Sequence, residues 1–172
     1  MKGTISFYLE KGQLIKDRNA ISLSSEYLKK AKSNLITMKL LSELNNTKVR
    51  ELLEIPEDYN SDEWIVITGY YAMYTSALAL LAKIGFRSKN HAATLLLLEE
   101  LFVKKKLLDK KSFLILKGAL FQKEEIEKLS DARHKREIAQ YSITKETTRS
   151  IAEKIKKDAY DFVNKTEQII LE

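Results

Sequence analysis

Arginine and tyrosine side chains lie close together in one short stretch of the chain. Arg136 and Tyr141 are five residues apart, and Arg133 precedes Arg136 by three. On a helix this spacing projects the side chains from neighbouring turns, so that they can converge on one phosphate or one nucleotide. A guanidinium binds phosphate through two parallel N–H groups, and a tyrosine hydroxyl can donate a further hydrogen bond. The spacing is typical of an anion-binding site.

A second polar group of residues interrupts an apolar stretch earlier in the chain, where Tyr70, Tyr71 and Tyr74 occur. Two interpretations of each stretch stay open. The tyrosines are core residues with satisfied hydroxyls, or at least one of them stacks on a base or contacts a phosphate. Arg136 either packs its stem while its head reaches solvent or an acidic partner, or it binds phosphate in a groove.

The composition leaves few other kinds of chemistry. The chain of 172 residues has no cysteine, which excludes disulfides, thiolate catalysis and cysteine-bound zinc. It has no glycine-rich phosphate loop, no paired metal-ligand spacing and no Ser-His-Asp arrangement. A zinc site would need His91, His134 and acidic residues to converge from separate segments. We expect neither a metal nor a cofactor.

The charge balance is basic, with a formal net charge of +6 and a pI near 9.3. This balance permits weak association with nucleic acid or an anionic membrane. Lysine-rich solvated helices give the same balance without any such partner. The densest run is Lys104–Lys106 followed by Lys110 and Lys111, which we expect at a helix end and the turn after it.

The backbone-breaking residues are scarce, with one proline and five glycines, and the pattern predicts a single all-α domain over residues 1–172. Apolar residues at steps of three and four mark the helices. The predicted long helices cover 22–41, 64–84, 92–106 and about 123–141, with a last helix after Thr144. Shorter helical pieces are predicted over 3–18, 47–55 and 107–120.

The helix predicted over 64–84 carries one charge and is long enough to span a membrane. Its threonines and tyrosines weaken insertion, and the other amphipathic helices need a partner for their apolar stripes. We therefore expect a buried central helix and no membrane. Asn60 and Glu63 form a capping box before it, and Gly85 ends it. Gly69 in its interior indicates a close helix crossing.

Taken together, these stretches resemble HEPN domains, specifically the branch paired with small MNT-type nucleotidyltransferases. The first half of the resemblance runs from Tyr70 to Leu81 and continues with Gly85 and Lys89-Asn90-His91. The second half is Arg133, Arg136, Ala139 and Tyr141, which are similar to an Arg-x-x-Arg-x-x-Ala-Asp-Tyr pattern. The closing helix is matched by Thr147, Ala152, Ala159, Phe162 and Val163. The resemblance covers residues 24–170.

This resemblance implies an up-and-down bundle of four to five main helices that forms a homodimer with a cleft between protomers. Members of the family bind nucleotides, cleave RNA without a metal, or act as partners of a nucleotidyltransferase in toxin–antitoxin pairs. The nuclease members use an arginine and a histidine four to six residues apart. Here Arg136 fills the arginine position, but Tyr141 stands where the histidine would be. A tyrosine of ordinary pKa near 10 is protonated at neutral pH, and lowering that pKa to 7 needs about 4 kcal/mol.

We therefore expect a HEPN-type homodimer that binds a nucleotide or RNA and works with a nucleotidyltransferase-like partner. Tyr141 donates a hydrogen bond in this hypothesis, and Lys89 and His91 rim the cleft if the loop after the central helix folds toward it. The phosphate- or nucleotide-binding residues are then Arg133, Arg136, Lys89, His91 and Tyr71. Two alternatives stay open: a metal-independent ribonuclease with Arg136 and Tyr141 as its catalytic pair, and a non-catalytic structural interaction module.

Residues 1–23 lie outside the resemblance. They extend the bundle, swap across a dimer or dock a partner, and the sequence does not decide among these. The first twenty residues are mixed polar and show no secretory leader, so we expect a cytoplasmic protein.

Overall fold

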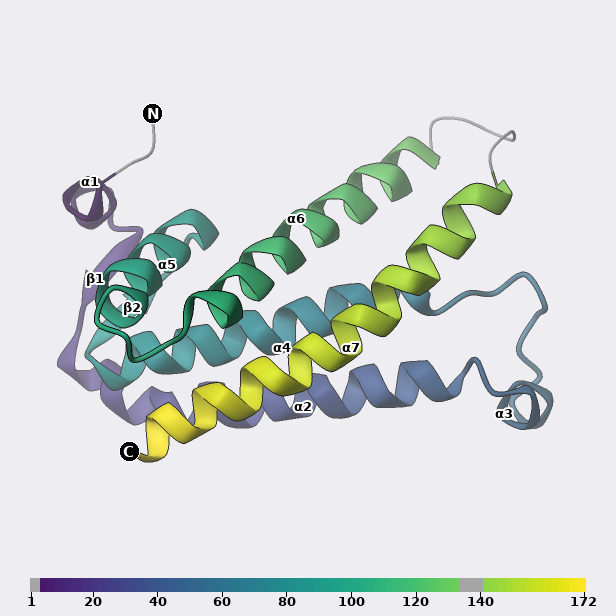
Figure 1. Cartoon of the computed structure of the whole chain (residues 1–172), viewed down its shortest axis with the longest axis horizontal. Coiled ribbons are helices and arrows are strands. Elements are labelled where there is room, and N and C mark those ends of the chain that lie inside the picture. Colours follow the sequence, from purple (N-terminus) through teal and green to yellow (C-terminus); the bar gives the residue numbers. More distant parts are fainter. Residues whose placement is uncertain (1–3, 134–140) are drawn as a thin grey trace.

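The long helices of the chain form an up-and-down bundle in the computed structural model, as the sequence predicts (Figure 1). The structure describes the backbone of residues 4–133 and 141–172 and the side chains of residues 4–124 and 148–172. Its elements in chain order are α1 (Ile5–Glu10), β1 (Leu14–Lys16), η1 (Arg18–Ser22), α2 (Leu23–Glu43), α3 (Thr47–Leu52), α4 (Asp62–Lys83), β2 (Phe86–Ser88), α5 (His91–Leu98), the π-helical η2 (Glu99–Val103), α6 (Lys110–Arg133) and α7 (Tyr141–Leu171).

The central helix is α4, which packs against α2, α6 and α7. Within the described residues it is the one helix long and apolar enough to cross a membrane, but 72% of its apolar window is buried inside the protein. A helix buried to this extent packs in the core of the protein. The single lysine of α4, Lys83, donates hydrogen bonds to the carbonyls of Ile169 and Ile170 at 2.8 Å. Lys83 thereby satisfies carbonyl groups that the last turn of α7 leaves without helical partners.

Gly69 lets three long helices meet closely, which confirms the predicted crossing. A Cβ built on Gly69 of α4 would lie 2.4 Å from Cγ2 of Ile155 on α7 and 3.0 Å from Sδ of Met38 on α2. Both of these side chains are buried. Any side chain at position 69 would therefore displace α7 or α2 from the centre of the bundle.

The residues predicted to cap α4 lie at its two ends, but the start of the helix differs from the predicted one. The Asn60 carboxamide accepts a hydrogen bond from the Asp62 N–H at 2.8 Å, and the buried Ser61 hydroxyl donates to the Leu41 carbonyl at 2.9 Å. The cap position is thus Ser61, one residue later than predicted, and α4 starts at Asp62 instead of Trp64. Gly85 follows the helix with a φ of 76°, a conformation that glycine adopts without strain.

The prediction of a helix over residues 3–18 is wrong beyond Glu10. The chain turns at Gly12, whose φ is 63°, and then forms β1, which pairs antiparallel with β2. Leu14 faces Ser88 in this pairing, and its side chain is 1% exposed. A glycine in the left-handed region, here Gly12, ends a helix. The strand β1 that follows forms because β2, from a distant part of the sequence, pairs with it. Residues 4–23 therefore extend the bundle within the same chain.

The helix boundaries after Leu98 also differ from the prediction. The α-helix predicted over 92–106 changes to π-helix at Glu99, and the pieces predicted over 107–120 and from 123 form the single helix α6. Gln122 and Lys123 do not break α6, because both residue types favour helix. Tyr141 is the first residue of α7 and not the end of the preceding helix, so the stretch 142–144, predicted as a break, is helical. Serine and threonine are tolerated in a first helical turn.

Asp109 fixes the start of α6. Its carboxylate accepts hydrogen bonds from the Ser112 N–H and the Ser112 hydroxyl, both at 2.8 Å. The bond from the Ser112 backbone is the main reason that the pKa of Asp109 lies below its ordinary value. A carboxyl group with a lowered folded-state pKa stabilises the fold above its unfolded pKa, and this contribution is lost as the pH falls through the folded pKa.

We expect Asp109→Ala to lower the free energy of unfolding by about 1 kcal/mol at neutral pH, because the helix loses its cap. The difference from wild type is expected to shrink in strongly acidic solution, as the pH falls through the lowered pKa of Asp109 and the carboxyl group of the wild type takes up its proton. Urea unfolding at the two pH values measures both numbers. Asp161→Ala, which removes an exposed carboxylate from α7, serves as the control. An equal cost of Asp109→Ala at both pH values would contradict the cap.

Candidate functional site

Tyr70 and Tyr74 of α4 meet His91, the first residue of α5, in one aromatic cluster. The Tyr70 hydroxyl forms a hydrogen bond with Nδ1 of His91. The Tyr74 ring stacks on the His91 ring with centroids 4.3 Å apart, and Tyr70 stacks on Tyr74 at 5.8 Å. The two tyrosines are four residues apart on α4, so they share one face. The start of α5 is fixed by Asn90, whose carboxamide accepts from the Ala93 N–H at 3.0 Å.

The hydroxyl of Tyr74 reaches a second polar group at the edge of the cluster. It lies 3.3 Å from the Thr94 hydroxyl, which donates to the Ser88 hydroxyl and the Asn90 carbonyl. Burial raises the pKa of Tyr74, while the hydrogen bond with Thr94 opposes the shift. Tyr74 is therefore protonated at neutral pH, and its hydroxyl does not serve as a general base there.

Lys123 of α6 completes the cluster, and it is not among the residues predicted for the site. Its Nζ lies 5.8 Å from the ring centroid of Tyr70 and 5.7 Å from that of Tyr71, within the range of a cation–π contact. The Lys123 side chain is only 9% exposed, whereas Tyr71 is 37% exposed. The signal that could have found Lys123 is its position seven residues after the buried Leu116, on the inner face of one continuous helix.

The structure separates the predicted site residues into two groups. His91 and Tyr71 belong to the aromatic cluster, and Lys89 is exposed next to it, with its N–H bonded to the Gln13 carbonyl at 2.9 Å. Lys89 lies in the connection from β2 to α5, and His91 is the first residue of α5.

The second group lies where α6 gives way to α7. Arg133 is the last residue of α6 and Tyr141 the first residue of α7. Their side chains, and Arg136 as a whole, lie outside the described part of the chain. Their role in anion binding remains a prediction. The backbone places the carboxyl end of α6 and the amino end of α7 at one end of the bundle, away from the β-strands (Figure 1).

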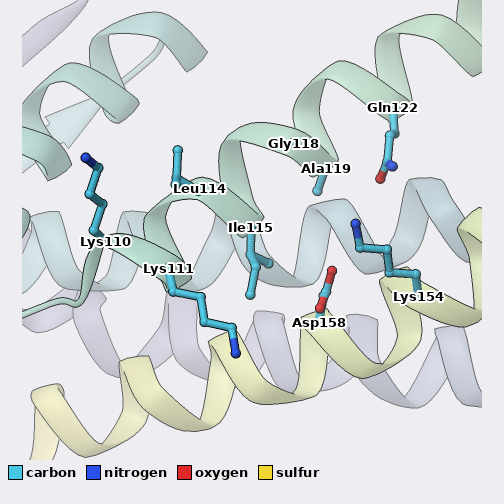
Figure 2. Close-up of a pocket in the computed structure, with 9 residues that line it drawn as sticks. All are labelled: Lys110, Lys111, Leu114, Ile115, Gly118, Ala119, Gln122, Lys154 and Asp158. Atoms are coloured by element: carbon cyan, nitrogen blue, oxygen red, sulfur yellow. The ribbon is translucent and has the colours of Figure 1, made fainter.

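A groove of about 460 Å³ runs between α6 and α7. Figure 2 shows Ile115 and Ala119 pointing into it from α6, with Lys111 directed toward α7 and Lys154 and Asp158 rising from α7. Among the described residues its lining is Lys110, Lys111, Leu114, Ile115, Gly118, Ala119, Gln122, Lys154 and Asp158. Burial raises the pKa of Asp158, and the neighbouring Lys154 opposes the shift. The groove combines an apolar floor with lysines, and none of the predicted site residues with a described side chain lines it.

Comparison with known proteins gives a family for this bundle. No family model matches the chain, and no solved structure matches it. A protein of Archaeoglobus fulgidus described as a UPF0332 protein is 35% identical over 103 residues, which are 60% of this chain and 71% of the relative. The chain belongs to the UPF0332 family. This family name states no activity, so the function of the site rests on its residues.

In this UPF0332 protein the described side chains of the aromatic cluster serve mainly to hold helices together. Tyr70, Tyr74 and His91 bond and stack with one another, and they join α4 to α5. Lys123 joins α6 to the same cluster. Tyr71 is the cluster tyrosine with the most exposed ring, so it is the one that a ligand can reach.

Proposed function

We propose that this UPF0332 protein is a HEPN-type homodimer that binds a nucleotide or RNA by its phosphates at the junction of α6 and α7. The observation that supports the proposal is that Arg133 is the last residue of α6 and that His134, Lys135 and Arg136 follow it in the sequence before α7 starts at Tyr141. The first N–H groups of a helix lack helical partners and attract anions, and α7 supplies such an end at Tyr141. Basic side chains and a helix start together favour phosphate.

Arg133 and Arg136 hold phosphate oxygens in this proposal, each through its planar pair of N–H donors. The Tyr141 hydroxyl donates a further hydrogen bond. Lys89 and His91 rim the interprotomer cleft in this proposal. Tyr71 offers an exposed ring edge for stacking on a base.

A nucleotidyltransferase-like partner, in a toxin–antitoxin-like pair, belongs to the same proposal, and its support is the resemblance to the HEPN branch described above. The ribonuclease alternative lacks a histidine after Arg136. The chain has two histidines, and the ring of His91 is bonded to Tyr70 and stacked on Tyr74. In RNA cleavage a base removes the proton of the 2′-hydroxyl group. Tyr141 would then have to act as this base, although its ordinary pKa is about 10. Binding without cleavage is therefore the preferred function.

The first experiment measures binding of a labelled single-stranded RNA and of ATP to wild type and Arg136→Ala across a salt series. We expect the wild type to bind less tightly as salt rises, and Arg136→Ala to bind about tenfold or more weakly with a reduced salt slope. Arg149→Ala removes an exposed arginine from the same end of α7 and is the matched control, expected to bind within about twofold of wild type.

The same tubes, with a chelator present, are followed for cleavage products. RNA cleavage that Arg136→Ala abolishes would favour the ribonuclease. Absence of binding by the wild type would overturn the proposal. If Arg136→Ala in addition melts earlier than Arg149→Ala, the arginine stabilises the fold and the chain is a structural interaction module.

A further inference from the structure

The groove between α6 and α7 has the size and the floor of a small-molecule site. Its volume of about 460 Å³ lies in the range of pockets that hold small organic ligands. Ile115 and Ala119 of α6 form an apolar floor (Figure 2). Ala119 is 1% exposed and belongs to the hydrophobic core, against which Ile115 packs. A ligand with an apolar body would therefore remove apolar surface from water when it enters the groove.

Gly118 leaves part of this groove unfilled. A glycine inside a helix is unfavourable relative to alanine. Gly69 has a reason within the fold, because Ile155 and Met38 occupy the space of its missing Cβ. A Cβ on Gly118, in contrast, would meet no atom within 4 Å. Since Gly118 lines the groove, its missing side chain gives a ligand room to lie against the backbone of α6.

The rim of the groove carries more positive than negative charge. Among the described residues its charged lining is three lysines, at positions 110, 111 and 154, and one carboxylate, Asp158, an excess of two positive charges. None of these lysines forms a salt bridge with a described residue, whereas four other lysines of the described chain pair with glutamates. The rim therefore attracts an anion, and a cation would meet three like charges there.

The two helices contribute the charges from opposite sides. Figure 2 shows Lys111 directed from α6 toward α7, and Lys154 and Asp158 rising from α7. An anionic group in the groove would thus have a lysine on either side. Asp158 acts against such a ligand, because it is the one negative charge in the described lining.

We propose that the groove between α6 and α7 binds a small organic anion with an apolar chain, such as a medium-chain carboxylate. The chain lies on Ile115 and Ala119 beside Gly118, and the anionic group lies against the lysines of the rim. This binding goes beyond the proposed function, since the ligand is one small molecule and its site does not include Arg133, Arg136 or Tyr141.

Titration calorimetry of the full chain with sodium octanoate at neutral pH tests the site. Octylammonium has the same chain with the opposite charge, and acetate has the same anionic group without the chain. We expect octanoate to bind at one site per chain, and octylammonium and acetate to bind about tenfold or more weakly, because each lacks one of the two matched features.

Two charge changes with opposite expected signs locate the ligand. Lys111→Glu is expected to weaken octanoate binding about tenfold, and Asp158→Asn to strengthen it about fivefold, because the first adds and the second removes negative charge at the rim. Asp58→Asn is the matched control for the second variant. It makes the same change at an exposed residue between α3 and α4 and is expected to bind octanoate within about twofold of wild type.

Gly118→Leu tests the place of the chain. Since nothing in the described fold opposes a side chain at this position, we expect the variant to keep the circular dichroism of wild type and to bind octanoate no better than acetate. Octylammonium that binds as tightly as octanoate would overturn the proposal. Octanoate binding that neither Gly118→Leu nor Asp158→Asn changes would place the ligand elsewhere and overturn it too. A wild type that binds no octanoate would have the same meaning, and it would leave RNA binding through Arg136 untouched.

Discussion

Phe162→Ala is expected to lower the free energy of unfolding by about 4 kcal/mol. Phe162 lies on α7 and is 1% exposed, and it belongs to the core that α7 forms with α4 and α2. Removing the ring loses its transfer free energy and leaves a cavity that the long helices can close only in part. For a chain of this size the melting temperature is expected to fall by roughly 8 to 16 °C.

Tyr160→Ala provides the comparison, because Tyr160 is an aromatic residue on the same helix that is 39% exposed. We expect its cost to stay near or below about 1 kcal/mol. Urea unfolding followed by circular dichroism gives both values. If Phe162→Ala and Tyr160→Ala lowered the free energy of unfolding equally, the face of α7 that carries Phe162 would not be directed toward the core.

Gly69→Ala is expected to destabilise the protein by up to about 2 kcal/mol, although alanine is the better helix former. The added carbon would lie 2.4 Å from Cγ2 of Ile155, which is shorter than any van der Waals contact. Overpacking of this kind costs about 1–3 kcal/mol, while the higher helix propensity of alanine returns about 1 kcal/mol. The first effect is larger because the Ile155 methyl is held close to its backbone and cannot move aside freely.

Gly118→Ala is the matched control, since it makes the same substitution in a helix where 4 Å of open space surrounds the new carbon. It is expected to stabilise the isolated chain by about 0.5–1 kcal/mol, measured at a concentration that keeps the chain monomeric. In an Ile155→Ala background the cost of Gly69→Ala is expected to shrink, because the opposing methyl is gone. If Gly69→Ala destabilises the Ile155→Ala protein as much as the wild type, Ile155 does not face Gly69.

The core of the fold was predictable because each part of it has a local signal. The apolar residues of α2 and α4 recur at helical steps, Gly69 marked the crossing, and Gly85 marked a helix end that the structure confirms. The two-stranded sheet has no such signal. Leu14 becomes a strand residue because Ser88, far away in the sequence, lies opposite it.

The candidate site was predictable only where its residues are close in sequence. Arg133, Arg136 and Tyr141 stand out by spacing alone, and they remain predictions because their side chains lie outside the described residues. Lys123 was missed, because its role depends on α6 running unbroken beside Tyr71. His91 was predicted at a cleft rim and is placed against Tyr70 and Tyr74 by the packing of α5 on α4, which no local pattern encodes.

The pairing of β1 with β2 imposes an order on assembly while the chain is being made. Ser88 is 74 positions after Leu14, so at 5–20 residues per second the ribosome delivers the second strand about 4 to 15 s after the first. During that time α2 and most of α4 have emerged, whereas Leu14 and Ile15 have no strand to pair with. Residues 14–16 therefore leave the ribosome before α2 and α4 but reach their native place only after β2 has been made.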